Sequence, residues 1–278
     1  MPELPEVEAA RVLARRVALG RRITRVWCAG DPIVFEAAPT QVRRALLGRR
    51  VREVGRHGKH LWLELDRRPW PCFHFGMAGG FHTPQVRGVR LVSAGERDPG
   101  DAWPPRFAKL RLTFDDGGEL VMTDARRLGR IRLRTDPRAE PPVSGLGFDA
   151  LLGLPTPARF AELLAERSAP VKALLLDQSF AAGVGNWIAD EALYQARIAP
   201  LRRAHSLSRA EARRLRAALR SVVRTAVAAR ADSDRFPRSW LFHHRWGRDA
   251  GAVTARGERV RHDTIAGRTT AWVRAVQR

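Results

Sequence analysis

The sequence has 278 residues, enough to bury a core and to form about two domains. It carries 50 Lys and Arg against 29 Asp and Glu, and the resulting charge of +21 is spread along the whole chain. This excess of positive charge favours a nucleic-acid partner, because Lys and Arg that neutralise phosphates release counterions from the nucleic acid. A membrane surface is less favoured, because the chain has no transmembrane run or lipidation signal. An Arg-rich genome is the alternative explanation for the charge.

The first predicted element is an amphipathic helix that begins almost at the first residue. Apolar side chains recur at helical spacing from Pro5 to about Leu19, and Gly20 ends the pattern. Short alternating runs then predict strands at 23–28, 61–65, 110–114 and 131–133. An Asp-Asp-Gly-Gly turn at 115–118 is typical of a hairpin. Residues from about 20 to 135 are therefore predicted to form an antiparallel sandwich or barrel.

A change of composition after Asp136 predicts a domain boundary. Pro and Gly crowd residues 137–156, which we interpret as an interdomain linker. Helices are predicted to begin at Thr156, near Pro170, at Trp187 and at Ser208, where Glu211 completes a capping box. The final stretch is rich in Arg, Gly and β-branched residues and predicts a small hairpin. The sequence thus predicts an α+β chain, with domains at 1–136, 157–231 and 232–278.

The opening Met-Pro-Glu-Leu-Pro-Glu offers a nucleophile. Removal of Met1, expected before a small residue, would leave the secondary amine of Pro2 at the chain end beside Glu3. An α-amino group titrates near about pH 8, so a fraction is unprotonated at neutrality and can attack a sugar C1′. The iminium ion makes the C2′ proton acidic, with Glu3 and Glu6 as proton donors or acceptors. An ordinary Pro-Glu helix start is the alternative interpretation.

This opening resembles the formamidopyrimidine-DNA glycosylase and endonuclease-VIII-like family, whose members begin Pro-Glu-Leu-Pro-Glu-Val-Glu and use that proline as nucleophile. The resemblance covers nearly the whole chain, with several motifs in the family's order. It implies a β-sandwich followed by a helical domain. It also implies a bifunctional glycosylase and abasic-site lyase that removes oxidised purines through a Schiff base on Pro2, followed by β,δ-elimination.

Further motifs carry the resemblance through the N-terminal half. Lys59 resembles the family's hairpin lysine, which contacts a phosphate at the lesion; a solvated turn residue is the alternative. His74 and Met77 resemble a phosphate-contacting histidine and a void-filling methionine, although methionine is ordinarily a core residue. In Asp-Ala-Arg-Arg-Leu-Gly, Arg126 resembles the arginine that pairs with the opposite base. Leu128, where many relatives have Phe, resembles the wedge that replaces stacking lost on base flipping.

The C-terminal half carries a second motif. Residues 171–191 resemble a helix-two-turn-helix, in which glycines allow close approach to the DNA backbone and amides at a helix N-terminus bind phosphate. Asn186 is expected to contribute a side-chain donor and Lys172 a charge. A plain helical hairpin with a Gly turn is the alternative.

The family usually ends in a four-cysteine zinc finger, which this sequence cannot form because its two cysteines are Cys28 and Cys72. Neither zinc nor another cofactor is expected. The tail from 247 to 278 resembles the zincless finger of the plant-type branch, with Arg268 as the finger arginine. The cysteines are typical of reduced thiols in an intracellular protein, placed in the cytoplasm or nucleoid of a bacterium or the nucleus of a eukaryote.

The resemblance implies a monomer that binds double-stranded DNA containing oxidised bases or abasic sites. The segment 232–238 is short, whereas zinc-bearing relatives have a longer loop there that caps 8-oxoguanine. The resemblance therefore favours formamidopyrimidines and hydantoins over 8-oxoguanine as substrates. Two alternatives stay open at this point. One is a damaged-DNA-binding protein of the same fold without catalysis, and the other is a basic RNA-associated protein, which leaves Pro2 and Glu3 without a role.

Overall fold

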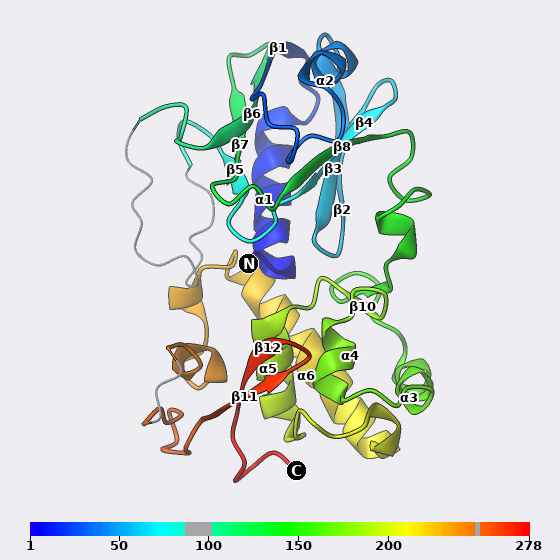
Figure 1. Ribbon diagram of the computed structural model, residues 1–278, viewed down its shortest axis with the longest axis vertical. Coiled ribbons are helices and arrows are strands. Elements are labelled where there is room, and N and C mark those ends of the chain that lie inside the picture. Colours follow the sequence, from blue (N-terminus) through cyan, green and yellow to red (C-terminus); the bar gives the residue numbers. More distant parts are fainter. Residues whose placement is uncertain (87–101, 248–250) are drawn as a thin grey trace. The chain divides into compact units, whose positions relative to one another are not determined.

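The computed structural model describes residues 1–86, 102–247 and 251–278 (Figure 1). The chain divides into two compact units, residues 1–145 and 146–278. The division falls inside the segment interpreted as a linker from its Pro and Gly content. The range expected to form the finger includes 248–250, which lie outside the described residues.

Unit 1 opens with helix α1 (Leu4–Ala18), as predicted from the apolar spacing. Its described strands form two four-stranded antiparallel sheets. One sheet has the order β1 (Ile23–Cys28), β6 (Ala108–Phe114), β7 (Glu119–Thr123) and β5 (Gly80–His82). The other has the order β2 (Val51–His57), β3 (His60–Leu65), β4 (Trp70–His74) and β8 (Arg130–Arg134). Each strand predicted from alternation lies in one of these sheets.

Both sheets and α1 contribute side chains to one apolar core. Leu112 comes from the first sheet, Leu63 from the second and Val7 from α1, and each is at most 1% exposed. A helix that the sequence analysis did not predict, α2 (Pro39–Leu46), adds Val42 and Leu46 to this core. Burial of apolar surface from two facing sheets is the arrangement of a sandwich. The predicted antiparallel sandwich is confirmed.

Unit 2 is mainly helical. Its helices in the described residues are α3 (Pro157–Ala165), α4 (Val171–Leu176), α5 (Asn186–Ala196) and α6 (Arg209–Ala228). Thr156 accepts a hydrogen bond from the Arg159 amide, and Ser208 and Glu211 form the predicted capping box of α6. A short parallel pair joins β9 (Phe148–Asp149) to β10 (Ala181–Ala182), so residues 148–149 belong to unit 2 rather than to a free linker.

The chain ends in an antiparallel hairpin of β11 (Arg261–Ile265) and β12 (Arg268–Trp272). Ala266 and Gly267 form its turn with φ of 49° and 70°. Two consecutive left-handed residues match the right-handed twist of the strands. Short 3-10 turns occur at Val143–Gly145, Ala204–Ser206, Ser233–Arg235 and Leu241–His244. None of the helices in the described part of the chain combines the length and apolar character needed to cross a bilayer.

Candidate active site

The amino end of the chain sits among charged side chains of unit 1. Glu3 directly precedes α1 and is 3% exposed, and its backbone N–H donates to Glu6 Oε2 at 2.9 Å. Burial lowers the pKa of the Met1 amine, while Glu3 and Glu6 raise it and Lys59 and Arg126 lower it. These influences act on the Met1 amine, which directly precedes Pro2 in the chain. The fold therefore gathers the predicted carboxylates, the hairpin lysine and the loop arginine around one amino group.

Glu6 has the properties of a proton carrier. Burial first, and then the neighbouring charge of Glu3, raises the pKa of Glu6 to about 7. A carboxyl that titrates near neutrality can donate a proton and take it back in one reaction cycle. Glu6 is therefore suited to carry a proton at neutral pH.

Lys59 lies in the turn between β2 and β3 and is 7% exposed. The preceding Gly58 is left-handed, with φ of 56°. Arg56 is completely buried, and its Nη1 donates to the Gly58 carbonyl at 2.9 Å while its Nε donates to Glu8 Oε2 at 2.8 Å. Because Glu8 belongs to α1, this ion pair ties the turn that carries Lys59 to the helix that carries the amino end.

His74 ends β4 as a neutral ring. Its Nδ1 accepts from the Gly76 N–H at 3.2 Å, and the ring lies 4.8 Å from that of His60. Burial, together with the charge of Lys59, lowers the pKa of His74 to about 4. Since Nδ1 is the acceptor, the ring proton resides on Nε2. His74 therefore offers a neutral N–H donor, which can bind a phosphate oxygen.

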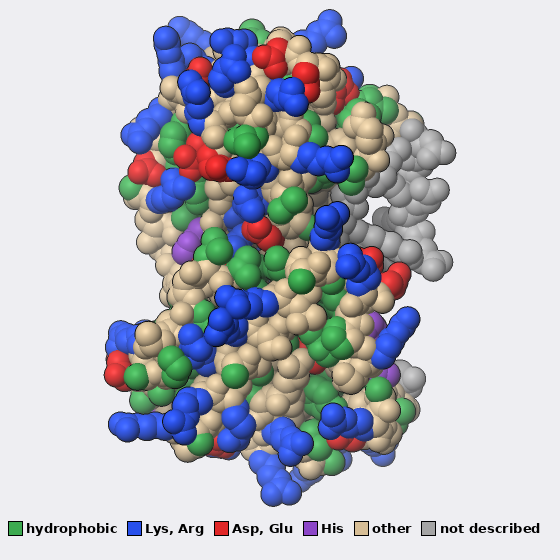
Figure 2. Space-filling view, turned by 180° about the vertical axis from the view of Figure 1, so that it is seen from behind, with side chains coloured by type: hydrophobic (Ala, Val, Ile, Leu, Met, Phe, Trp, Pro, Cys, Tyr) green, Lys and Arg blue, Asp and Glu red, His purple; other side chains and the backbone are tan. Residues whose placement is uncertain are grey.

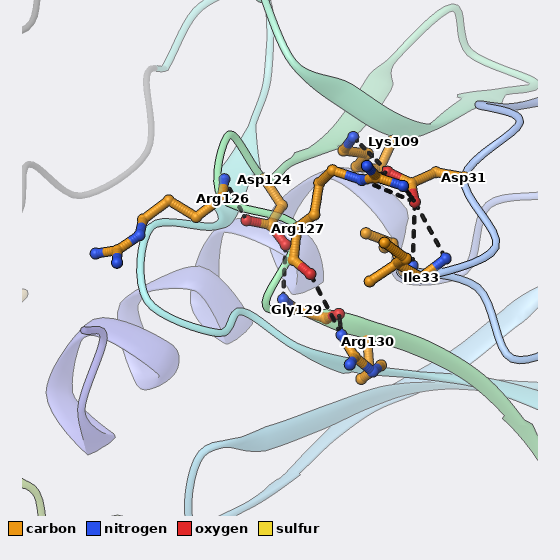
Figure 3. Close-up of polar contacts among 9 residues, drawn as sticks. Asp31, Ile33, Lys109, Asp124, Arg126, Arg127, Gly129 and Arg130 are labelled. Carbon is orange, nitrogen blue, oxygen red and sulfur yellow. Dashed lines mark hydrogen bonds and ion pairs between the residues drawn. The ribbon is translucent and has the colours of Figure 1, made fainter.

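The loop at 124–129 is organised by two carboxylates (Figure 3). Asp124 is fully buried, and its oxygens accept from the backbone N–H of Arg126 at 3.1 Å and of Gly129 at 2.6 Å. Arg127, with φ of 56°, turns its guanidinium to Asp31, with Nε and Nη2 both 3.0 Å from the carboxylate. Arg126 extends away from this cluster and is exposed. The loop thus keeps Arg127 in an ion pair with Asp31 and leaves the side chain of Arg126 exposed to solvent.

The turn that carries Met77 packs directly on this loop. At Gly76, which has φ of 60°, a Cβ would lie 2.4 Å from the backbone carbon of Leu128 and 2.5 Å from the Gly129 nitrogen. Leu128 is 45% exposed, and Met77 is half-buried. The two side chains predicted to fill the void left by a flipped base therefore lie on adjacent turns.

Lys172 corrects a prediction. It was expected to offer a charge to DNA, but its side chain is completely buried. Its ammonium forms an ion pair with Asp190 and donates to the Asn186 carbonyl at 2.9 Å. A Lys is buried in this way when a carboxylate neutralises it, so we assign Lys172 an internal role. Asn186 uses one amide hydrogen on the Thr269 carbonyl, at 2.7 Å.

Arg268 is exposed at the start of β12. The described residues contain no grouping of three or more His, Cys, Asp and Glu side chains that could hold a metal ion. Cys28 and Cys72 are buried free thiols, and burial raises their pKa to about 11 and about 12. Neither thiol is therefore a thiolate at neutral pH.

Sequence reasoning missed the residues that brace these turns. Arg127 is 96 residues from its partner Asp31, and Arg56 is 48 residues from Glu8. No local pattern marks such pairs. The role of Asp124 was also missed, although the residue stands at the start of the Asp-Ala-Arg-Arg-Leu-Gly motif. An Asp that begins a tight turn regularly accepts hydrogen bonds from the amides that follow it.

Known protein families and relatives match both units of the chain. The family model of the formamidopyrimidine-DNA glycosylase N-terminal domain matches residues 1–131, and that of the formamidopyrimidine-DNA glycosylase H2TH domain matches residues 146–237. The chain belongs to the formamidopyrimidine-DNA glycosylase family. A formamidopyrimidine-DNA glycosylase of Arabidopsis thaliana is 42% identical over 100% of this chain and 71% of its own length. One from Thermus thermophilus is 35% identical over 97% of this chain and 96% of its own.

Solved structures show the same fold. A Lactococcus lactis formamidopyrimidine-DNA glycosylase, bound non-covalently to DNA containing an abasic site, superimposes with a TM-score of 0.81 over 99% of each chain at 22% identity. A MutM structure in complex with DNA containing carbocyclic 8-oxoguanine also gives 0.81, over 100% of each chain at 22% identity. The predicted fold class of a sandwich followed by a helix-two-turn-helix domain is confirmed.

Proposed function

We propose that this protein is a bifunctional DNA glycosylase and abasic-site lyase of base excision repair, with Pro2 as its nucleophile once Met1 is removed. The observation that carries the proposal is the set of charges around the amino end, from Glu3, Glu6, Lys59 and Arg126. The names of the relatives support the activity. The expected substrates are formamidopyrimidines, hydantoins and abasic sites.

In the first step C1′ becomes bonded to the Pro2 nitrogen and loses its bonds to the base and to the ring oxygen O4′. The Pro2 nitrogen attacks C1′ and loses its proton to Glu6, whose pKa of about 7 suits a proton acceptor at neutrality. The bond from C1′ to the base breaks, and the base leaves with the proton that Glu6 took from the nitrogen. Opening of the sugar, with proton delivery from Glu3 to O4′, converts the adduct to an iminium ion.

The second step cleaves the strand. The Glu3 carboxylate, which gave its proton to O4′, removes the C2′ proton, and the iminium ion accepts the electron pair that is released. The C3′–O bond then breaks with loss of the 3′ phosphate. A second elimination expels the 5′ phosphate. Water hydrolyses the remaining imine and regenerates the amine of Pro2. Each step moves only protons and electron pairs among the amine, the carboxyls, the DNA and water, so no oxidant is needed.

The other predicted site residues are proposed to hold the DNA. Lys59 and the neutral His74 would bind phosphate at the lesion, and Arg126 would meet the opposite base while Met77 and Leu128 fill the void. Asn186 and Arg268 would bind backbone phosphates from unit 2. The excess of Lys and Arg, which are distributed over the face shown in Figure 2, supports a polyanionic partner.

Borohydride trapping tests this function. The processed protein is incubated with a duplex containing an abasic site or a hydantoin, borohydride is added, and the covalent complex is quantified. Pro2→Gly and Glu3→Gln should each reduce trapping by at least about 100-fold, the usual scale for removing a nucleophile or acid–base group. Pro39→Gly is the matched control, because it makes the same substitution at the first residue of α2, a helix that carries none of the predicted site residues. Duplex binding without trapping would instead favour the non-catalytic alternative.

A further inference from the structure

The terminal hairpin is fastened to α5 at two alternate residues of β12. Asn186 Nδ2 donates to the Thr269 carbonyl at 2.7 Å, and the Ala271 N–H donates to Asp190 Oδ2 at 3.2 Å. Positions 186 and 190 lie one turn apart on the same face of α5. The strand that begins with Arg268 is therefore held to one helix face by backbone groups on two of its first four residues.

Asp190 is the centre of this attachment. Its side chain is completely buried. One oxygen pairs with the ammonium of Lys172 from α4, and the other accepts from Arg245 Nη2 at 2.6 Å and from Nε at 3.2 Å. A buried carboxylate is tolerated when cations and hydrogen-bond donors satisfy it. One side chain thus joins α4, α5, β12 and the segment that follows Leu241–His244.

Arg245 extends the attachment to the other strand of the hairpin. Its guanidinium lies 4.7 Å above the Trp246 ring and is nearly buried. Its carbonyl is 3.3 Å from His262 Nε2 on β11. Both strands are therefore tied to groups that meet at Asp190. The left-handed turn at Ala266 and Gly267 then fixes where β12 begins.

We propose that Asp190 is a positioning residue for DNA binding, which holds the backbone of Arg268 at a fixed place through Ala271 and Arg245. The proposal rests on the phosphate contact of Arg268 given under the proposed function. An arginine on a fixed strand loses less conformational freedom on binding than one on a loose segment. Asp190 itself is buried and touches no DNA, so it acts only through the hairpin.

The test is a double-mutant cycle on binding to a duplex with an abasic-site analogue, measured at several salt concentrations. Arg268→Ala should weaken binding about tenfold and reduce the slope of log affinity against log salt by about 0.9, as expected for one lost phosphate contact. Asp190→Asn should reproduce most of both effects. The affinity of the double variant should lie within about twofold of that of Arg268→Ala alone. If Asp190 acts only by positioning Arg268, its substitution has no further effect once the arginine is absent.

Val223→Ala is the matched control for lost stability. Val223 is fully buried in α6, so its truncation lowers the melting temperature of the protein without touching the hairpin contacts. It should leave the salt slope unchanged, and its effect on affinity should multiply with that of Arg268→Ala. A merely structural role for Asp190 would give the same pattern as Val223→Ala.

Arg245→Met is the second variant should Asp190→Asn not fold, since it leaves Asp190 paired with Lys172. It should likewise show no further loss when combined with Arg268→Ala. Losses that multiply in either cycle would overturn the positioning role. An unchanged affinity in Arg268→Ala would overturn both that role and the proposed phosphate contact, while borohydride trapping would still report on the chemistry at Pro2.

Discussion

Asp31 in unit 1 and Asp190 in unit 2 each form ion pairs with two cations, but the two clusters differ in how far their side chains are buried. Each carboxylate gathers one lysine and one arginine from distant parts of the chain. Asp31 pairs with Lys109 at 2.7 Å and with Arg127 at 3.0 Å, but the Arg127 side chain is 48% exposed. Lys172 of the Asp190 cluster is completely buried, and Arg245 is nearly so.

The difference in depth matches what each cluster holds. Asp31 braces the loop that presents Arg126 and Leu128, side chains that we propose enter the DNA. A partly solvated ion pair contributes little to stability, so such a loop can adjust at small cost. Asp190 anchors a hairpin, and a buried carboxylate cannot lose a partner cheaply. A lysine and an arginine paired with one carboxylate therefore hold a loop that can adjust in unit 1 and a hairpin that is fixed in unit 2.

Matched lysine substitutions give the largest expected effect. Lys172→Met should lower the free energy of unfolding by about 3 kcal/mol, because it leaves a buried carboxylate with one cation fewer. Lys109→Met should lower it by about 1 kcal/mol, because water reaches the Asp31 cluster. Urea denaturation of the two variants measures both values. Equal losses would show that depth does not separate the clusters.

Gly76→Ala tests how far the loop of the shallow cluster can move. The new Cβ would meet the Leu128 backbone at 2.4 Å in a left-handed conformation, so we expect a loss of about 2–3 kcal/mol in unfolding free energy. Gly117→Ala is the control, since Gly117 also has a positive φ, 82°, but open space around it. It should cost about 1 kcal/mol of strain alone. If thermal unfolding ranks the two variants alike, the Met77 turn does not press on the loop.

Glu6 sharpens the comparison because its pKa is raised, whereas the pKa of Asp31 is lowered by Arg127 and Lys109. Burial raises the pKa of Glu6 from 4.5 to about 7, so the folded state binds a proton that the unfolded state releases. Its stabilising contribution is full below pH 4.5 and is lost as pH rises to about 7. The loss should be about 3 kcal/mol, because each pKa unit corresponds to about 1.4 kcal/mol.

Unfolding free energies measured from pH 4 to pH 8 check this prediction. The fall in stability attributed to Glu6 should be absent in Glu6→Gln. The rate of base removal should also lose its inflection near pH 7 in that variant. A Glu6→Gln protein that retains both pH dependences would assign the titration to another group.

Ala266→Asn has the smallest expected effect. Ala266 occupies a left-handed position that Asn adopts more readily, and the change creates an Asn-Gly hairpin turn. We expect a gain of about 0.5–1 kcal/mol, seen as a higher melting temperature in calorimetry. Because Asp190 already fixes the hairpin, affinity for DNA should not change. Tighter binding would mean that the anchor leaves the hairpin mobile.

Local patterns predicted many of the regular elements, whereas most of the candidate site residues came from the family resemblance. Apolar spacing placed α1, alternation placed strands of both sheets, and Ser208 with Glu211 placed the start of α6. Lys59 and Arg126 lie in turns, and His74 is the last residue of β4. Such features depend on residues close together in the chain, which is why periodicity and turn chemistry are sufficient to find them.

The errors and omissions among the site residues involve partners that are distant in the sequence. Lys172 was assigned to DNA because nothing near it in the sequence shows that Asp190, 18 residues on, neutralises it. Arg245 reaches the same carboxylate from 55 residues away. Helix α2 was missed because only Val42 and Leu46 of its eight residues are buried, a pattern too short to distinguish from a loop. Long-range pairing of charges follows from the fold and leaves no local signal.

The central claim is that the nitrogen of Pro2 forms the covalent bond to the sugar. Peptide mapping by mass spectrometry of the borohydride-trapped complex tests it most directly. The account predicts a deoxyribose adduct on the amino-terminal nitrogen of a chain that begins at Pro2. An adduct on the Lys59 ammonium nitrogen, or fully active protein that retains Met1, would contradict it.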